Sequence, residues 1–335
     1  MDSRTEMNQP IRIAPESKSK LKMVPCGKCG ASVFIAGDIP RFQTTPCTKC
    51  GHPVMLPVRL RQFELRSIVA SGGMGTVFRA FDTSLDRMVA VKLMKPELSS
   101  DEALVKSFSR EARACARLNH TNIIHIYAFD DIEGEKYIVM ELCDCGSLDD
   151  KLTADGKVDE LHILDVGIKI SYGLIAAMKH NLLHLDIKPA NILYNDEGEP
   201  KLVDFGLASK SDEEFTADEG GVMGTPDYIA PERVQQTGQD FRSDMYSLAA
   251  TMYHCLTGRV PFEADGIEAT AFAHITEPLI PPLDLNPELS EQTSNAICMA
   301  MAKRPEDRFQ SYDEFIMSLE ASRSYLLVQR FRPGR

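Results

Sequence analysis

The residues whose types are best suited to chemistry lie in one short segment, residues 184–191, and at residue 204 soon after it. Asp186, Lys188 and Asn191 put a carboxylate, an ammonium group and an amide on one loop, and Asp204 adds a second carboxylate. Asp186 could accept or orient the proton of an attacking hydroxyl group, and Lys188 could neutralise a phosphoryl group during transfer. Asn191 and Asp204 offer the hard oxygen ligands that Mg²⁺ prefers. Together these residues are suited to phosphoryl transfer with a divalent metal ion.

Two features nearer the N-terminus could bind the phosphates of a nucleotide. Gly72, Gly73 and Gly75 lie between two expected strands, and without Cβ atoms they allow close approach to phosphate and positive φ. Lys92 ends the apolar run Val89-Ala90-Val91, where a buried ammonium group needs an anion, and Glu111 is a nearby carboxylate. Each feature has a plainer interpretation, because glycine-rich hairpins are common and a lysine at a strand end can keep its charge in water.

The elements that must position these residues change character along the chain. Strands are expected at 63–69, 77–80, 88–93, 123–129 and 136–141, with one amphipathic helix between 100 and 118. After residue 147 the pattern is mostly helical, with helices expected at 161–180, 244–256, 292–302 and 312–322 and short strands at 192–194 and 201–203. Strands followed by helices predict two lobes of different architecture with a cleft between them.

The motifs within this frame resemble those of protein kinases over residues 63–319. They come in the order of that family: the glycine-rich loop, Val-Ala-Val-Lys92, Glu111, His184-x-Asp186-x-Lys188-Pro-x-Asn191, Asp204-Phe205-Gly206 and Ala230-Pro231-Glu232. The residues of these motifs are most similar to those of bacterial serine/threonine kinases. The resemblance implies an α+β, two-lobed kinase fold, with a small β-rich lobe at 63–142, a larger helical lobe at 146–320 and a tail at 321–335.

The same resemblance implies roles for individual residues. Asp186, Lys188, Lys92 and Glu111 would be catalytic, and Asn191 and Asp204 would hold Mg²⁺ or Mn²⁺. The residues implied to bind ATP are Val69, Ala70, Gly72, Gly73, Gly75, Val77, Ala90, Lys92, Met140, Glu141, Cys143 and Leu193.

Structural roles are implied for three more residues. Glu232 would pair with Arg308, and Asp244 would support the catalytic loop from beneath.

Two positions depart from the family pattern. Ala70 replaces the first glycine of the phosphate loop, which would cost about 1 kcal/mol or more if φ must be positive, so nucleotide affinity is expected to be modest.

Leu185 replaces an arginine that in many kinases binds a phosphorylated activation segment. We therefore hypothesise that activity depends little on phosphorylation of Ser209, Ser211 or Thr216. The alternative is that the acidic residues 212–219 are merely a solvated surface loop. Thr225 is expected to be structural rather than a phosphorylation site.

Four cysteines form two C-x-x-C pairs, Cys26 with Cys29 and Cys47 with Cys50, each followed by glycine. Two such turns can direct four thiolates at one ion, which predicts structural Zn²⁺. The arrangement resembles a zinc ribbon at 21–58 that follows a flexible arm at 1–20. A redox dithiol is the alternative, disfavoured because there are two pairs and no βαβ pattern. The ribbon could bind a protein partner, bind nucleic acid or cap the small lobe. Its basic patch is thin, which favours a protein partner or a structural role over nucleic-acid binding.

Charge and hydropathy narrow the possible partners and location. Of the net charge of −12, residues 1–61 carry +6 and the remainder −18, and the acidic part argues against nucleic-acid binding. No signal-like apolar core opens the chain and no run of roughly 18 apolar residues occurs, so a cytoplasmic protein without a membrane partner is expected. The remaining cysteines are expected to be buried, reduced thiols: Cys115, Cys143, Cys145, Cys255 and Cys298.

Two functions fit the sequence. The first is an enzyme that transfers the γ-phosphoryl group of ATP to Ser or Thr hydroxyl groups of protein substrates. The second is a pseudokinase scaffold that binds nucleotide and protein partners without catalysis. The presence together of Lys92, Asp186, Asn191 and Asp204 favours the enzyme, because a scaffold needs none of the four.

Overall fold

The computed structural model describes residues 20–205, 209–210 and 225–330, apart from the side chains of Ser107, Glu111, Ala114, Ser209 and Lys210. Two compact units make up the chain: residues 1–67 with 80–87, and residues 68–79 with 88–335.

The first unit contains two small antiparallel hairpins. Strand β1 (Leu21–Pro25) pairs with β2 (Ser32–Ala36), and β3 (Thr44–Pro46) pairs with β4 (Pro53–Met55). The C-x-x-C turns close at Gly30 and Gly51, which have φ of 70° and 73°, a conformation that glycine adopts without steric cost. A small core lies between the hairpins, made of Cys26, Val33, Ile35, Cys47 and Val54.

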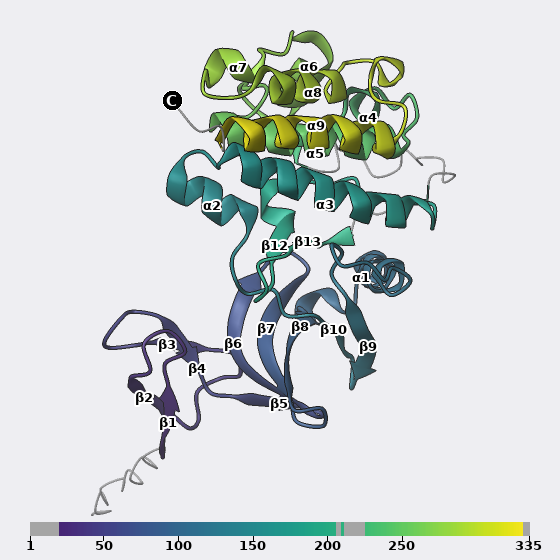
Figure 1. Cartoon of the computed structure of the whole chain (residues 1–335). Helices are drawn as coiled ribbons and strands as arrows, with labels where there is room; N and C mark the ends of the chain where they lie inside the picture. Colours follow the sequence, from purple (N-terminus) through teal and green to yellow (C-terminus); the bar gives the residue numbers. More distant parts are fainter. Residues whose placement is uncertain (1–19, 206–208, 211–224, 331–335) are drawn as a thin grey trace, which may run out of the picture. The chain divides into compact units, whose positions relative to one another are not determined.

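A six-stranded antiparallel sheet follows, with the strand order β5-β6-β7-β8-β10-β9 (Figure 1). Its strands are β5 (Val58–Leu60), β6 (Phe63–Ser71), β7 (Gly75–Asp82), β8 (Arg87–Met94), β9 (Ile126–Ile132) and β10 (Glu135–Met140). A short 3-10 turn, η1 (Pro96–Leu98), leads into helix α1 (Glu102–Cys115). Phe108 and Ala112 of α1 are buried with Met94 and Ile138 of the sheet, so the apolar stripe expected in the sequence faces the strands.

The rest of the second unit is mainly helical. Its helices are α2 (Leu148–Asp155), α3 (Glu160–Met178), α4 (Pro231–Gln235), α5 (Phe241–Thr257), α6 (Ile267–Thr276), α7 (Pro282–Leu285), α8 (Glu291–Ala300) and α9 (Tyr312–Arg330). Short strand pairs are β11 (Leu182–Leu183) with β14 (Ser209–Lys210) and β12 (Ile192–Tyr194) with β13 (Pro200–Leu202). Single 3-10 turns occupy η2 (Pro189–Asn191), η4 (Pro226–Tyr228) and η5 (Pro305–Asp307).

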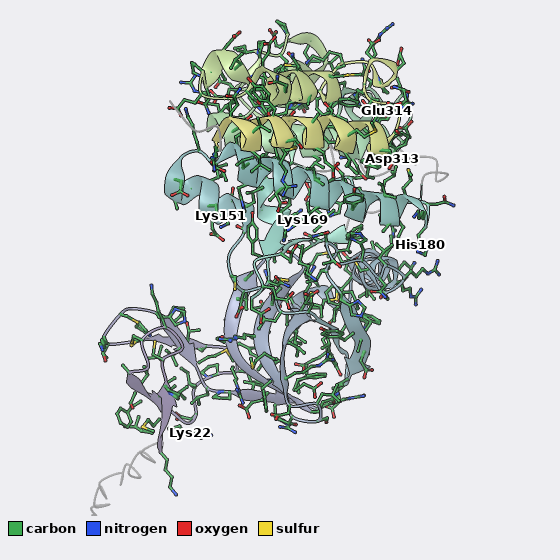
Figure 2. The ribbon with its side chains drawn as sticks, viewed as in Figure 1. Lys22, Lys151, Lys169, His180, Asp313 and Glu314 are labelled. Atoms are coloured by element: carbon green, nitrogen blue, oxygen red, sulfur yellow. The ribbon has the colours of Figure 1, made fainter. Side chains whose placement is uncertain are left out.

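Local sequence sets where these helices begin and end. Ser147 and Asp150 form a reciprocal capping box at the start of α2, and Gly156 ends that helix with positive φ. Asp159 caps α3, and Asp240 caps α5. On the outer side, Lys169 of α3, visible in Figure 2, forms an ion pair with Glu199 at 2.9 Å, which connects α3 to the turn before β13.

Helix α5 is the centre of the helical part, with fourteen of its residues buried, and it packs against α3 (Figure 1). Among the described residues, α3 alone is long and apolar enough to span a bilayer, although polar residues interrupt its apolar sequence. However, 56% of that segment is buried and α3 contacts α5 and α9, so α3 serves as a core helix.

These elements confirm the predicted α+β architecture, with a strand-rich part before a helical part and the cysteine cluster before both. The last helix differs in length, because α9 continues to Arg330 and not to residue 322. The reason is tertiary: Leu326 packs against the core, and the guanidinium group of Arg330 lies 2.6 Å from Asp159 Oδ1.

Candidate active site

A cleft of about 340 Å³ in the second unit brings together residues from β6, β7, β8, β10 and the loops around β12. All twelve residues predicted to bind ATP line it, as do both predicted metal ligands, Asn191 and Asp204. The sequence interpretation had left out six further lining residues: Ser71, Met74, Ile124, Leu142, Ala190 and Val203. Most of the exposed surface of the cleft is apolar, as a pocket for a flat aromatic base requires.

The linker from β10 to α2 forms one side of this cleft. The carboxylate of Glu141 pairs with the nearly buried ammonium group of Lys201 at 2.7 Å, so Glu141 can face a ligand only with its backbone. Cys143 is buried, and this burial raises the pKa of its thiol to about 12. The expectation that Cys145 is buried is wrong, because this thiol is exposed while its backbone N–H donates to Tyr194 O.

The glycine-rich turn between β6 and β7 differs from the expectation of positive φ. Gly72, Gly73 and Gly75 all have φ outside the positive range, and so does Ala70, which continues strand β6. The methyl group of Ala70 is therefore accommodated without backbone strain. At Gly75 the reason for glycine is space, because an added Cβ would lie 2.6 Å from Leu93 O on the neighbouring strand. An added Cβ at Gly73 would meet nothing within 4 Å.

Lys92 and Asp204 face each other across the cleft. Strand pairing places Lys92 opposite Ile138, and its Nζ lies 3.9 Å from Asp204 Oδ1. The Lys92 side chain is 14% exposed and that of Asp204 44%, so Asp204 is open to the cleft. The predicted partner Glu111 lies in α1, but its side chain is outside the described residues.

The loop that contains Asp186 is held by buried polar contacts. Asp244 of α5 accepts hydrogen bonds from the backbone N–H groups of His184 at 2.7 Å and Leu185 at 2.8 Å, as the resemblance implied. The His184 ring contacts Val203 O at 2.9 Å and packs edge-on against Phe205, with 4.5 Å between ring centroids. These contacts fix the loop relative to the residues around Asp204.

Asp186 lies at the centre of a network of charged and polar groups. Lys188 Nζ is 2.7 Å from Asp186 Oδ2, and Asn191 Nδ2 donates to both Asp186 O and Asp186 Oδ2, at 2.8 and 3.1 Å. Burial opposes ionisation, but the ammonium group of Lys188 holds the pKa of Asp186 below its ordinary value. Asp186 is therefore ionised at neutral pH and can accept a proton.

Thr225 completes this network, in a way the sequence did not specify. Its hydroxyl group donates to Asp186 Oδ1 at 3.1 Å and accepts from Lys188 Nζ at 2.8 Å. Thr225 was expected to be structural rather than a phosphorylation site, and its hydroxyl group contacts both charged groups of the loop. The Gly-Thr-Pro wording was the only sequence signal for it.

Asn191 and Asp204 have the chemistry to hold Mg²⁺ or Mn²⁺. The amide nitrogen of Asn191 is engaged by Asp186, which turns its Oδ1 away from that carboxylate. Asp204 adds a partly exposed carboxylate on the same cleft. Oxygen donors of this kind fit a hard divalent cation.

A buried ion pair anchors helix α4. Arg308 contacts both oxygens of Glu232 at 2.7 and 2.8 Å, which confirms the expected pair, and Ser243 Oγ donates to Glu232 Oε1 at 2.7 Å. Of the residues discussed for phosphorylation, Ser211, Thr216 and the acidic residues 212–219 lie outside the described part of the chain, as does the side chain of Ser209.

The first unit contains a second candidate site, the four cysteine thiols. All four sulfur atoms lie within 4.8 Å of one another, with Cys26–Cys50 and Cys29–Cys47 separations of 3.6 Å. A tetrahedral Zn²⁺ site with Zn–S bonds of about 2.3 Å requires separations of about 3.8 Å, so the geometry fits zinc.

The acid–base chemistry of these thiols also fits a cation. Backbone N–H groups of Lys49 and Cys50 lower the pKa of Cys47 to about 7. The N–H group of His52 acts on Cys50 in the same direction, but desolvation and the three neighbouring thiols raise the pKa of Cys50 to about 12. Four thiolates so close together need a positive charge between them.

Comparison with known proteins places these observations in a family. The sequence model of the protein kinase domain matches residues 63–317. The chain is 37% identical over 268 residues to the serine/threonine-protein kinase PknA of Mycobacterium tuberculosis, covering 78% of this chain and 62% of the relative. It is 36% identical over 259 residues to a "probable serine/threonine-protein kinase" of Clostridium perfringens, covering 77% of this chain and 38% of that relative. The chain thus spans between about two-fifths and three-fifths of the length of these relatives.

Proposed function

This chain belongs to the protein kinase family, and from that premise we propose that it is a serine/threonine kinase that transfers the γ-phosphoryl group of ATP to hydroxyl groups of other proteins. The observation that carries the proposal is the network around Asp186. Its carboxylate is held by Lys188, Asn191 and Thr225 beside a cleft that Lys92 and Asp204 share.

The cleft supports a division of roles for nucleotide binding. Val69, Val77, Ala90 and Leu193 would sandwich the adenine ring, with Met140 at the back of the pocket and the backbone of Glu141 and Cys143 at the adenine edge. Lys92 would hold the α- and β-phosphates, together with Glu111. The turn that contains Gly72 and Gly73 would cover the phosphates with its backbone.

The residues near Asp186 support the chemical step. Asp186, ionised at neutral pH, would orient the attacking hydroxyl group and accept its proton. Lys188 would neutralise charge on the transferring phosphoryl group, and Thr225 would hold the side chains of Lys188 and Asp186 next to each other. Asn191 and Asp204 would hold Mg²⁺ or Mn²⁺, which neutralises phosphate charge when bound.

The alternative of a pseudokinase scaffold lacks support. A scaffold would have no need for Lys92, Asp186, Asn191 and Asp204 together, yet all four are present and three of them line one cleft with the fourth beside it.

The decisive experiment measures phosphate incorporation into a generic protein substrate with Mg-ATP. Asp186→Asn should lower kcat by about 10²–10⁴-fold, because the proton acceptor is lost. Asp313→Asn, on the exposed start of α9 (Figure 2), is the matched control and should behave like wild type. Equal incorporation by wild type and Asp186→Asn would eliminate the proposed mechanism.

We also propose that activity depends little on activation-segment phosphorylation, since Leu185 offers no guanidinium group to a phosphate. Replacing Ser209, Ser211 and Thr216 together by Ala should leave most of the activity of the wild type. A near-total loss in that triple variant would refute this part of the proposal.

For the first unit we propose a ribbon-like module that binds structural Zn²⁺ through Cys26, Cys29, Cys47 and Cys50. We further propose a protein partner with an acidic, partly apolar segment. Residues 20–61 carry a net charge of +6. The side chains of Leu21, Met23 and Phe34 are exposed on the β1–β2 hairpin, where Met23 pairs with Phe34 across the two strands.

The partner proposal is tested with full-length chain and three probes: a Glu/Leu-rich peptide, single-stranded RNA and anionic vesicles. The peptide should bind, and Phe34→Ser should weaken that binding, whereas Leu85→Ser at another exposed apolar position should not. Tighter binding of RNA or vesicles than of the peptide would contradict the partner proposal.

A cytoplasmic location is proposed from the chemistry of the cysteines, because all nine are free thiols.

A further inference from the structure

We propose that Arg233 is a positioning residue for phosphoryl transfer: from helix α4 it holds the backbone of the catalytic loop in place, so that the loop is ordered without a phosphate group. This inference rests on the proposed kinase activity and adds a residue that neither the sequence motifs nor the cleft include.

The backbone of Leu185 is the feature that needs support. Leu185 has φ of 66°, in the left-handed region that a leucine adopts only at a steric cost. A residue in this conformation persists only where its surroundings over-determine it. Leu185 precedes Asp186, so any relaxation of its backbone would rotate the catalytic carboxylate away from Lys188 and Thr225.

Two ionic side chains hold the peptide groups on either side of Leu185. Its N–H donates to Asp244 Oδ1 at 2.8 Å, and its carbonyl oxygen accepts a hydrogen bond from Arg233 Nη1. Asp244 comes from α5 and Arg233 from α4, so the strained residue is held from both sides by elements distant in sequence. The carbonyl oxygen that accepts from Arg233 belongs to the peptide bond that leads directly into Asp186.

The charge of Arg233 is compensated where it lies. Burial lowers the pKa of its guanidinium group, and the carboxylates of Asp244, Asp186 and Glu232 act in the opposite direction. The guanidinium group of Arg233 therefore remains charged in its buried position beside these carboxylates. Arg233 therefore supports the backbone geometry that positions Asp186.

Helix α4 is rigid enough to serve as a support. Arg233 follows Glu232, which is fixed by Arg308 and by Ser243 Oγ. Where a kinase has arginine in place of Leu185, that side chain reaches from the catalytic loop toward a phosphorylated segment. Here an arginine just after that segment reaches the catalytic loop, and the contact forms between groups that need no modification.

The experiment compares Arg233→Gln, Arg233→Lys and the control Arg304→Gln, whose side chain is 67% exposed and paired with Asp307. For each full-length protein, dephosphorylated beforehand, kcat, the KM values for ATP and substrate, and the Kd for ATP are measured. Arg233→Gln should lower kcat by about 10–100-fold, as a small displacement of a catalytic group does, with Kd for ATP within about twofold of wild type. Arg233→Lys should restore part of kcat, because it keeps the charge without the planar fork.

Three outcomes would overturn the inference. The first is a kcat for Arg233→Gln within about threefold of wild type. The second is a parallel loss of kcat, ATP affinity and thermal stability in both Arg233 variants, which would indicate a merely structural role. The third is a wild type whose kcat falls to the Arg233→Gln level on dephosphorylation, because the loop would then depend on phosphate. An inactive wild type would instead count against the proposed function itself.

Discussion

At the scale of single residues, Thr225 has the most direct consequence for the reaction. Its hydroxyl group bridges Lys188 and Asp186, so Thr225→Val should disorder both charged groups while leaving the cleft unchanged. A hydrogen bond to a charged group contributes about 1.5–3 kcal/mol, so kcat should fall by about 10–100-fold with little change in KM for ATP. Thr225→Ser keeps the hydroxyl group and serves as the control. Wild-type kcat in Thr225→Val would show that the bridge has no role.

The ionisation of Asp186 gives a second prediction at this scale. Because its pKa in the folded protein is below the unfolded value of about 3.9, its charge contributes stability above that pH, and the contribution is lost as the pH falls through the folded-state pKa. Lys188→Met removes the main cause, so the pKa of Asp186 should rise, as measured by ¹³C NMR of its carboxyl carbon. Lys106→Met, at an exposed pair on α1, should leave it unchanged. An unshifted pKa in Lys188→Met would show that other groups hold the carboxylate.

At the scale of elements, the β6–β7 hairpin has one glycine with no space for a side chain and another with open space around it. Gly75→Ala would push a Cβ to 2.6 Å from Leu93 O, so β7 and β8 must separate and the floor of the cleft must shift. We expect Gly75→Ala to weaken ATP binding by about tenfold or more, equivalent to about 1.4 kcal/mol. Gly73→Ala, with open space around it and no positive φ, should change the Kd for ATP by less than about threefold. Equal effects of the two variants would contradict this distinction.

At the scale of the whole molecule, the two units should respond differently to metal removal. The core of the first unit includes Cys26 and Cys47 themselves, so a chelator or Cys47→Ser should make residues 20–60 sensitive to proteolysis. Metal analysis should find one zinc per chain in wild type and none in Cys47→Ser, with Cys298→Ser as the control. Kinase activity should survive, because the cleft lies in the second unit. A full zinc content in Cys47→Ser would exclude the site.

The order of motifs was enough to predict the architecture and the lining of the cleft. Lys92 and Asp204 are far apart in the sequence, and the resemblance to kinases, rather than local pattern, implied that they meet. Contacts that depend on tertiary placement could not be predicted in this way. Residue spacing and hydropathy do not indicate the pairing of Lys201 with Glu141. They also do not indicate the left-handed backbone of Leu185 or its hydrogen bond from Arg233.

The adjacent residues Ser243 and Asp244 contact different loops from one helix. Ser243 donates a hydrogen bond to Glu232 of α4, and Asp244 accepts hydrogen bonds from His184 and Leu185 in the loop that leads into Asp186. Since Ser243 and Asp244 are consecutive residues of α5, a displacement of one of the segments that they contact would also displace the other. We expect nucleotide entry and ADP release to proceed by tilting of the strands that carry Lys92. Residues 141–147 link β10 to α2, so this tilting would bend the chain there. Variants that speed or slow turnover without altering the chemical step should therefore cluster in these residues.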